Sequence, residues 1–321
     1  MLPPLNNIPT KTDLEETFSA LSGMVTKTPV ITSMTLDSLT GAKVFLKAEN
    51  FQKVGAFKYR GGCSAILRLT DEQKKNGVAA HSSGNHAQAV ALAARNMGVK
   101  SYIVMPKDAP LVKKDATRGY GAKIIECEST IEARETTLAE VVRKTGATEI
   151  HPYNYYPVIA GQATASMELM DEVSDLDFIL APIGGGGLIS GTCLAAKYFS
   201  PKTKVIGAEP TEVNEALLSL KKGELVKNKS LNTLADGLRT NIGEKNFEIV
   251  KSEIHDILEV SEKEMMDAMK WVWERMKIII EPSSAVPVAA LLKYEEMFNG
   301  KRVGIIITGG NVELKEIVSK L

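Results

Sequence analysis

The apolar residues of the chain recur with two different periods, which predict alternating strands and helices. From Gly77 onward, short runs rich in valine and isoleucine, such as GVAAHS, SYIVMP and KIIEC, alternate with longer stretches of helical period. After Gly146 the same rhythm continues through the helix GQATASMELMDEV, the strand DFILAPI, the helix LISGTCLAAKYF and the strand KVIGAE. This alternation is typical of βαβ units, so we predict an α/β protein built from two successive blocks.

The two ends of the chain complete the predicted order of elements. Thr12 and Glu15 form a capping-box pattern that predicts a short helix ending near Gly23. The last third holds a lysine-rich loop at 221–229, the strand DILEV, the helices MMDAMKWVWERMK and SAVPVAALLKY, and the strand RVGIIIT. No low-complexity linker separates the blocks, so we expect them to pack closely with a ligand site between them.

Composition and charge exclude several classes of function. The 321 residues are 44% hydrophobic and 24% charged, the ordinary mixture of a folded protein. Lysine plus arginine and aspartate plus glutamate number 39 each, so no net field favours nucleic acid as a partner. No segment reaches the roughly 18 apolar residues that a membrane span needs, and the start lacks a signal-peptide pattern, so we expect a cytoplasmic protein without a membrane partner. The three cysteines, Cys63, Cys127 and Cys193, are isolated along the chain and are expected to be reduced and buried.

Four consecutive glycines separate a fully apolar strand from the start of a helix; they are Gly184, Gly185, Gly186 and Gly187. Backbone without Cβ atoms lets several N–H groups converge on one anion, and the N-terminus of the following helix adds positive potential. A loop that is only flexible is uncommon between a buried strand and a helix. The pattern therefore predicts a phosphate-binding loop.

A dinucleotide-binding site is the competing interpretation of this loop. A strand, a glycine-rich turn and a helix also open that motif, and Glu209 at the end of the next strand could bind a ribose. The spacing Gly-x-Gly-x-x-Gly fails, however, because the third glycine would fall on Ile189 or Ser190. The spacing therefore disfavours a nicotinamide cofactor.

Lys58 lies in the segment GAFKYRGG between Phe57 and Tyr59, two residues before Arg60. Aromatic neighbours and a nearby cation lower the pKa of a lysine, and the free amine can then form a Schiff base. A lysine beside aromatic residues more often extends its amine into solvent. By itself this segment is a weak indication of catalysis.

Two further segments of small and polar residues end apolar strands. The loop HSSGNHAQA places hydroxyl, amide and imidazole groups at a helix N-terminus, where a carboxylate would bind favourably. These groups belong to Ser82, Ser83, Asn85 and His86. Helix capping, and a structural role for the histidine, are the alternatives. The segment ITGGN either offers the Thr308 hydroxyl to a ligand or forms a plain turn, and the sequence alone leaves both choices open.

Taken together and in this order, the four segments resemble the fold-type II pyridoxal-phosphate enzymes, and within them the serine racemase and serine/threonine dehydratase group. The similarity runs from TPVITS near Thr28 to GGNVEL near Leu314. It implies two open, twisted, mostly parallel sheets with helices on both faces, like the tryptophan synthase β subunit. It also implies a large cofactor-binding domain formed by residues 1–52 and 150–321, and a small inserted domain, 53–149, that carries the substrate-carboxylate loop.

The resemblance assigns roles in binding pyridoxal 5'-phosphate. It implies that Lys58 carries the cofactor as a Schiff base, that Phe57 backs the ring and that Asn85 binds the ring hydroxyl. Gly184–Gly187 would hold the phosphate. Thr308 stands where the family has a serine near the ring nitrogen. A neutral hydroxyl leaves that nitrogen unprotonated, which suits elimination and racemisation better than transamination.

The implied reaction removes the α-proton of a small hydroxy amino acid, with the Lys58 amine as general base. Loss of the β-hydroxyl then gives a 2-oxo acid and ammonia, whereas return of a proton to the opposite face gives the other enantiomer. In serine racemases a serine before Gly-Asn donates that proton; here it is Ser83, where threonine dehydratases usually carry alanine. We therefore expect a serine racemase with L-serine and L-threonine dehydratase activity.

Two alternatives to this function remain. The close one is a dedicated threonine or threo-3-hydroxyaspartate dehydratase with little racemisation, because related hydroxyaspartate dehydratases keep the same serine. The distant one is a catalytically silent binder of a phosphorylated ligand, which the presence of Lys58, Asn85 and Thr308 together disfavours.

The resemblance also implies contacts to the substrate. The groups that would bind its carboxylate are Ser82, Ser83, Asn85 and His86. Arg134 and Asp236 match positions near the polar end of the substrate. Ala163 replaces the second glycine of the usual GQGT, and its methyl group is expected to lie beside the pocket and to affect substrate size.

A divalent cation is a further expectation from the family. Glu209 and Glu215, with the Val213 carbonyl between them, match its ligands, and oxygen ligands of this kind suit Mg²⁺ or Ca²⁺. Two solvated glutamates are the alternative.

Assembly and regulation are also implied by the family. Lys53 matches a residue of the nucleotide site in mammalian racemases, but Met34 and Val54 replace hydroxyl side chains there. We therefore expect no ATP dependence. The family implies a homodimer.

Overall fold

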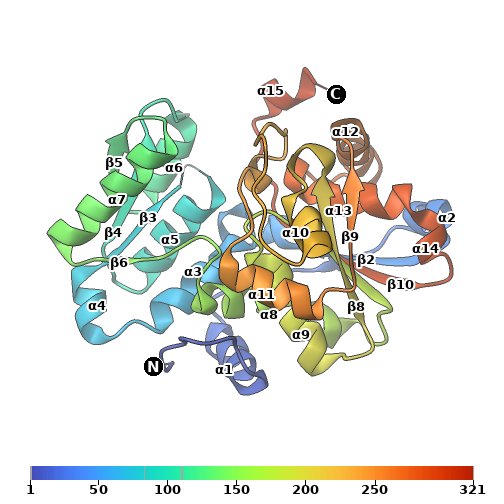
Figure 1. The fold of residues 1–321 in the computed structure, drawn as a ribbon, viewed down its shortest axis with the longest axis horizontal. Helices are drawn as coiled ribbons and strands as arrows, with labels where there is room; N and C mark the ends of the chain where they lie inside the picture. Colours follow the sequence, from blue (N-terminus) through green and yellow to red (C-terminus); the bar gives the residue numbers. More distant parts are fainter. Residues whose placement is uncertain (1, 83, 110, 321) are drawn as a thin grey trace.

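The computed structural model describes residues 2–82, 84–109 and 111–320, which form two α/β units (Figure 1). One unit contains a six-stranded sheet and the other a four-stranded sheet. Figure 1 shows the smaller unit, in cyan and green, beside the larger one. The predicted α/β class with two mostly parallel sheets is confirmed.

The strands of the larger sheet are β1 (Val30–Ile31), β2 (Lys43–Ala48), β7 (Phe178–Pro182), β8 (Lys204–Pro210), β9 (Asp256–Val260) and β10 (Arg302–Ile307). Their order in space is β1-β2-β10-β7-β8-β9. All pairs are parallel except β1 with β2. Strands β7 and β10 are buried along nearly their whole length, which explains their unbroken apolar sequences, since a parallel sheet is covered on both faces.

Helices cover both faces of the larger sheet, and an apolar cluster fills each face. The helices on one face are α1 (Lys11–Leu21), α8 (Tyr156–Glu172), α9 (Gly187–Phe199) and α11 (Glu244–Glu253). Those on the other are α2 (Met34–Thr40), α12 (Glu262–Trp271), α13 (Pro282–Lys293) and α14 (Glu295–Phe298). Helices α8 and α9 cross closely at Gly191, where a Cβ atom would lie 2.7 Å from the Ala163 nitrogen. Ala163 is fully buried at this crossing, and its effect on substrate size stays a prediction.

The smaller sheet is built from β3 (Val78–His81), β4 (Ser101–Pro106), β5 (Lys123–Cys127) and β6 (Thr148–Glu149). Its strand order is β5-β4-β3-β6, and every pair is parallel. Helices pack on both faces here as well; they are α3 (Lys58–Leu67) and α5 (Asn85–Asn96) on one side and α7 (Ile131–Thr145) on the other.

Helix α3 lies at the junction of the two units, because it packs against α8 of the larger unit and α5 of the smaller one. The domain boundary that we predict at residue 53 falls just before this helix. The remaining helices are α4 (Asp71–Asn76), α6 (Leu111–Gly119), α10 (Glu215–Lys222) and α15 (Leu314–Val318). Short 3-10 segments are η1 (Glu49–Phe51), η2 (Lys53–Gly55), η3 (Thr211–Val213) and η4 (Asp236–Leu238), and a π-helical segment, η5 (Val272–Met276), extends α12.

The opening helix begins earlier than we predict from the sequence. Thr10, rather than Thr12, caps α1, because its hydroxyl accepts from the Asp13 N–H while the Asp13 carboxylate accepts from the Thr10 N–H. The helix ends at Leu21, close to the predicted end at Gly23.

Two expectations from composition can be compared with the fold. All three cysteines are buried and free. Within residues 2–82, 84–109 and 111–320, no helix combines the length and the apolar character that crossing a membrane would need.

Candidate active site

Lys58 is the first residue of α3, and contacts to the end of β10 fix its position. The N–H of Phe57 donates to the Thr308 carbonyl at 2.9 Å. The Lys58 Nζ atom donates to the carbonyl of Pro152 at 3.0 Å and lies 5.1 Å from the centre of the Phe57 ring. The amine therefore points into the junction of the two units and not into bulk water.

Burial lowers the pKa of the Lys58 amine to about 8, and the negative charge of Glu281 limits the shift. Arg60 is not the cause, contrary to our expectation, because its guanidinium is paired with Glu49 and Glu168. An amine with a pKa near 8 is partly free base close to neutral pH, as attack on a carbonyl carbon requires.

The glycine loop Gly184–Gly187 connects β7 to α9, and neighbouring side chains exclude larger residues from it. A Cβ atom on Gly185 would lie 2.2 Å from the Tyr153 ring. One on Gly186, which has a φ of +90°, would lie 2.6 Å from the Asn246 Cβ atom. The loop needs glycine because the side chains of Tyr153 and Asn246 pack directly against its backbone.

The N–H groups of this loop suit an anion. Gly185, Gly186 and Gly187 are buried, and the described part of the chain provides no hydrogen-bond acceptor for their N–H groups. Buried N–H groups without partners are rare in folded proteins. Helix α9 begins at Gly187, so its N-terminus adds positive potential at the same place. The loop therefore fits the phosphate group of a cofactor.

The amine and the glycine loop meet through two consecutive residues. Pro152 accepts the hydrogen bond from Lys58, and Tyr153 packs against Gly185 and Gly187. The fold thus brings together two segments that the sequence analysis could only connect through a family resemblance.

A hydrogen-bond network joins the two units beside Lys58. The Asn85 amide donates to both oxygens of Glu281 at 3.1 Å, and its oxygen accepts from Asn311 Nδ2 at 2.8 Å. Asn311 Nδ2 also donates to the carbonyl of Val54, whose φ of +59° is rare for a β-branched residue. Burial raises the pKa of Glu281 to about 8. The Asn85 carboxamide and the Asn311 backbone N–H therefore hold a buried, easily protonated acid near the amine.

Thr308 presents a neutral hydroxyl at the end of β10. Its side chain is buried, and its hydroxyl hydrogen-bonds Ser284 Oγ at 2.8 Å. Ser284 Oγ also donates to the Gly309 carbonyl. The hydroxyl offered beside Phe57 is therefore held in place by a second hydroxyl rather than by an acid.

The HSSGNHAQA loop leads into α5, which begins at Asn85. Ser82 Oγ accepts from the Gly84 N–H at 3.2 Å, and His86 Nε2 pairs with the Ile150 carbonyl at 2.8 Å. Burial lowers the pKa of His86 to about 3, so its ring is neutral near pH 7. The pairing with Ile150 gives His86 a structural role, and its contact with substrate stays a prediction. Ser83 lies outside the described residues.

Arg134 and Asp236 lie in opposite units. Arg134 lies on α7, and its Nε atom is buried without a partner among the described residues. Burial lowers the pKa of His81, and the positive charge of Arg134 adds to this shift. Asp236, in η4, pairs with Lys113 of α6 across the two units, with 3.5 Å between the charged atoms. Its charge adds to the burial that raises the pKa of Glu281, which places Asp236 near that acid.

Glu209 and Glu215 form a buried pair at the end of β8. Glu209 accepts from the N–H groups of Ala216 and Leu217, and Glu215 accepts from the Ile242 N–H at 2.7 Å. Burial raises the pKa of both carboxyls, and the charge of Glu215 raises that of Glu209 further. Two carboxylates that repel each other in a buried place suit a divalent cation. No group of three or more histidine, cysteine or acidic side chains arranged for a metal occurs among the described residues.

Four site residues were missed by the sequence analysis: Lys113, Tyr153, Glu281 and Asn311. Glu281 directly precedes Pro282, which opens α13, so it has the sequence pattern of a helix cap. Asn311 lies in the ITGGN segment, where only the threonine was assigned. Tyr153 lies in an irregular loop and Lys113 on an exposed helix, and neither place carries a recognisable pattern.

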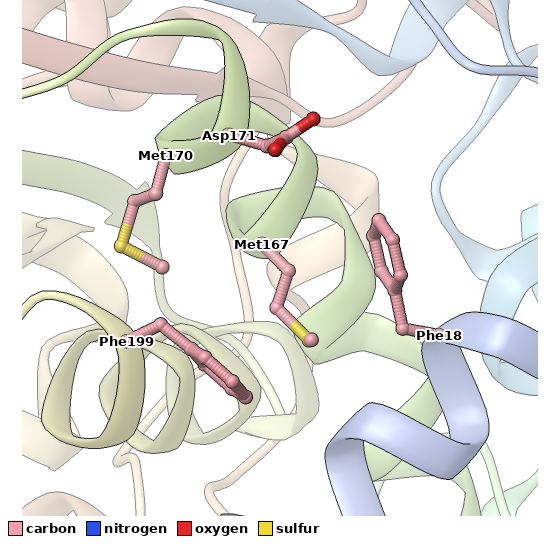
Figure 2. A pocket seen from close by; sticks show the side chains of 5 residues that line it. All are labelled: Phe18, Met167, Met170, Asp171 and Phe199. Atoms are coloured by element: carbon pink, nitrogen blue, oxygen red, sulfur yellow. The ribbon is translucent and has the colours of Figure 1, made fainter.

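A cavity of 260 Å³ lies on the outer side of the larger unit, between α1, α8 and α9. Figure 2 shows its lining side chains, Phe18, Met167, Met170, Asp171 and Phe199. No residue of the predicted site is among them, so this groove is separate from the amine and the glycine loop.

Comparison with known proteins agrees with this geometry. Residues 21–309 match the family described as pyridoxal-phosphate dependent enzyme. The chain is 46% identical over 310 residues to a beta-hydroxyaspartate dehydratase of Paracoccus denitrificans, covering 97% of this chain and 98% of the relative. It is 47% identical over 309 residues to a serine racemase of Dictyostelium discoideum, covering 95% of each chain.

The fold agrees with a solved structure as well. Maize serine racemase superimposes with a TM-score of 0.93 at 40% identity, covering 97% of this chain and 96% of that one. The matched stretch contains Lys58, the glycine loop and Thr308. The chain belongs to the family of pyridoxal-phosphate-dependent enzymes.

Proposed function

We propose that the protein is a pyridoxal 5'-phosphate-dependent serine racemase that also dehydrates L-serine and L-threonine. The observation that carries this proposal is the Lys58 amine, whose pKa is lowered to about 8 and whose carbonyl partner, Pro152, adjoins a residue packed on the glycine loop. Relatives named serine racemase and beta-hydroxyaspartate dehydratase support the same chemistry.

The residues divide the work of binding and proton transfer. The N–H groups of Gly184–Gly187 would bind the phosphate, and Phe57, Asn85 and Thr308 would hold the ring of the cofactor, its hydroxyl group and its nitrogen. When bound, the cofactor withdraws electrons from the α-carbon of the substrate and so acidifies its hydrogen. The Lys58 amine would hold the cofactor and, as the free base, would take the proton from the α-carbon of the substrate.

Ser83 decides between the two outcomes. If its hydroxyl returns a proton to the face of the α-carbon opposite Lys58, the product is the D-amino acid. If the β-hydroxyl leaves as water instead, later hydrolysis gives a 2-oxo acid and ammonia. A dehydratase with little racemisation is the second candidate, and the relative named beta-hydroxyaspartate dehydratase favours it.

Substrate binding draws on both units. The α-carboxylate binds at the N-terminus of α5 through Ser82, Ser83, Asn85 and His86. Arg134, whose Nε atom lacks a partner among the described residues, and Asp236 bind the far end of the substrate. A guanidinium there favours a second carboxylate, so threo-3-hydroxyaspartate is a candidate substrate.

A product assay tests the activity. The purified protein is incubated separately with L-serine, L-threonine and threo-3-hydroxyaspartate, and D-serine, pyruvate, 2-oxobutyrate and oxaloacetate are measured. We expect D-serine together with 2-oxo acids. Accumulation of 2-oxo acids without D-serine would reject the racemase activity and retain only the dehydratase activity. A protein that stays colourless with added cofactor would instead support the alternative of a catalytically silent binder of a phosphorylated ligand.

Mg²⁺ or Ca²⁺ is the proposed ion for Glu209, Glu215 and the Val213 carbonyl, where a bound cation relieves the repulsion between the two carboxylates. We expect either ion to raise the melting temperature by about 2–4 °C. The Glu209→Gln variant should lose this shift, and Glu212→Gln, at a neighbouring exposed position, should keep it. Equal shifts in both variants would place the ion elsewhere.

The protein is further proposed to be a cytoplasmic homodimer that acts without nucleotide activation. Lys53 donates its amine to the Met24 carbonyl at 2.6 Å, and Met34 offers an exposed apolar side chain. Sedimentation of the purified protein tests the dimer, and product formation with and without ATP tests the activation.

A further inference from the structure

Asn246, on α11, links the glycine loop to the segment that receives the Lys58 amine. Its side chain is fully buried. Its Nδ2 atom donates to the Gly185 carbonyl at 2.9 Å and to the Tyr153 carbonyl at 3.2 Å. Its side-chain oxygen is buried and has no donor among the described residues. The amide group is therefore committed to two carbonyls that belong to separate parts of the site.

This contact sets the orientation of the peptide between Gly185 and Gly186. The N–H of Gly243 donates to the same Gly185 carbonyl at 3.1 Å, so two donors from the start of α11 hold one acceptor. In a planar trans peptide the C=O and N–H bonds point in opposite directions. A carbonyl held against α11 therefore turns the Gly186 N–H away from α11, which leaves it free for an anion. Glycine alone would not enforce this choice, because it adopts many conformations.

The second hydrogen bond relates the loop to the amine. Tyr153, whose carbonyl accepts from Asn246, directly follows Pro152, whose carbonyl accepts from Lys58. The Asn246 carboxamide thus holds the glycine loop at a fixed distance from the Pro152–Tyr153 segment, which accepts the hydrogen bond from the Lys58 amine.

We propose that Asn246 is a positioning residue that sets the distance between the phosphate-binding loop and the Lys58 amine. The proposal rests on the cofactor role of Lys58 given above. A cofactor anchored at both ends binds tightly only when the two anchors have the right separation, because otherwise one contact is gained at the expense of the other.

The test measures cofactor binding directly. Asn246→Leu keeps a similar volume but removes both donated hydrogen bonds. We expect the dissociation constant for pyridoxal 5'-phosphate, measured by absorbance titration, to rise about ten- to a hundredfold, as the loss of two ordinary hydrogen bonds implies. The visible absorption band of the bound cofactor should also titrate at a different pH, because the amine no longer keeps its position.

A neighbouring variant separates positioning from helix stability. Phe247→Leu removes apolar packing of α11 from the core of the larger unit and leaves the Asn246 contacts intact. It should lower the melting temperature while the dissociation constant stays within about twofold of wild type, because the Phe247 side chain takes no part in the hydrogen bonds to Gly185 and Tyr153.

A second substitution and the wild type make each outcome decisive. Asn246→Asp has the same shape, loses the donors and adds negative charge, so it should weaken binding more than Asn246→Leu; Asn246→Ser replaces both if they do not fold. Wild-type binding and an unchanged band in a folded Asn246 variant would overturn this inference. A wild-type protein that binds no cofactor would instead overturn the proposed function.

Discussion

Helix α3 carries two cations, the partly buried Lys58 and the fully buried Arg60, whose surroundings differ. Arg60 is fully buried and makes four hydrogen bonds of 2.7 to 2.8 Å to the carboxylates of Glu49 and Glu168. Lys47 adds a second cation, 2.7 Å from Glu168. The Lys58 amine donates to the neutral carbonyl of Pro152 at 3.0 Å. The nearby Glu281 carboxylate accepts hydrogen bonds from Asn85 and Asn311 and not from this amine.

The pKa shifts follow this difference. Around Arg60, burial opposes the positive charge, but the charges and hydrogen bonds of Glu49 and Glu168 together outweigh burial and raise the pKa of the guanidinium. Burial likewise opposes ionisation of Glu168, yet its bonds to Arg60 lower the pKa of that carboxyl. Around Lys58, burial dominates, and it brings the pKa values of the amine and of Glu281 both to about 8. Paired buried charges are fixed in one state, whereas unpaired ones can exchange protons near neutral pH.

The largest expected effect comes from removing the unpaired cation. Lys58→Ala should lose the absorption band of the bound cofactor and lower kcat/KM by about 10⁴-fold, because both covalent attachment and the general base disappear. Absorbance spectra and initial rates of pyruvate formation check this.

Lys53→Ala is the matched control. This lysine lies just before α3, donates to the Met24 carbonyl and takes no part in the proposed chemistry. It should keep the band and most of the activity. A band that survives in Lys58→Ala would mean that another amine holds the cofactor.

Breaking the paired cluster should affect stability rather than chemistry. Glu168→Gln leaves Arg60 and Lys47 short of a negative charge in a buried place, so the free energy of unfolding should fall by about 3–5 kcal/mol. Urea unfolding at pH 7.5 measures this, and kcat of the protein that remains folded should stay within a few-fold of wild type.

Glu172→Gln gives the comparison at the rim of the same cluster, 3.5 Å from the Lys47 amine and partly exposed. Its cost should be about 1 kcal/mol or less, because exposed pairs contribute little. If Glu168→Gln instead lowers kcat as strongly as it lowers stability, the paired cluster positions Lys58 and is not purely structural.

The same contrast explains which parts of the molecule could be predicted from sequence. The parallel sheets and the glycine loop follow from local patterns, since buried strands are uniformly apolar and a clasped loop must be glycine. Strand β2, Lys43–Ala48, was not predicted although it lies inside the larger sheet, because Lys47 interrupts its apolar run. The structure shows that this lysine is fully buried against Glu168. Long-range charge pairing of this kind leaves no periodic pattern.

The same limit applies to the site. Lys58 and Thr308 were assigned because they belong to recognisable segments. Glu281, Asn311 and Tyr153 gain their roles only through contacts with residues far away along the chain. Burial was correctly expected to lower the pKa of Lys58, but a second contribution was wrongly assigned to Arg60, because adjacency in sequence gives no information about which charges are already paired.

The smallest expected effect is a difference in how the groups around Lys58 and those around Arg60 change the stability with pH. The raised pKa of Glu281 means that the folded protein binds a proton which the unfolded chain releases between pH 4.5 and about 8, so its contribution to stability falls as pH rises through this range. The lowered pKa of Lys58 means that the unfolded chain binds the extra proton between about 8 and 10.5, so its contribution rises there. Glu168, with a lowered pKa, loses its contribution only as pH falls below 4.5.

The contributions of Glu281 and Lys58, taken together, should therefore pass through a minimum near pH 8 in cofactor-free protein, on the order of 2 kcal/mol deep. Subtracting the curve of Glu281→Gln from that of wild type isolates the falling limb, because Glu209 and Glu215 contribute equally to both proteins. Lys58→Met should flatten the rising limb in the same way, and Glu168→Gln should change neither limb. A difference curve for Glu281→Gln that is flat between pH 4.5 and 8 would show that this acid ionises normally, and the distinction between the paired and the unpaired cation would then rest on Lys58 alone.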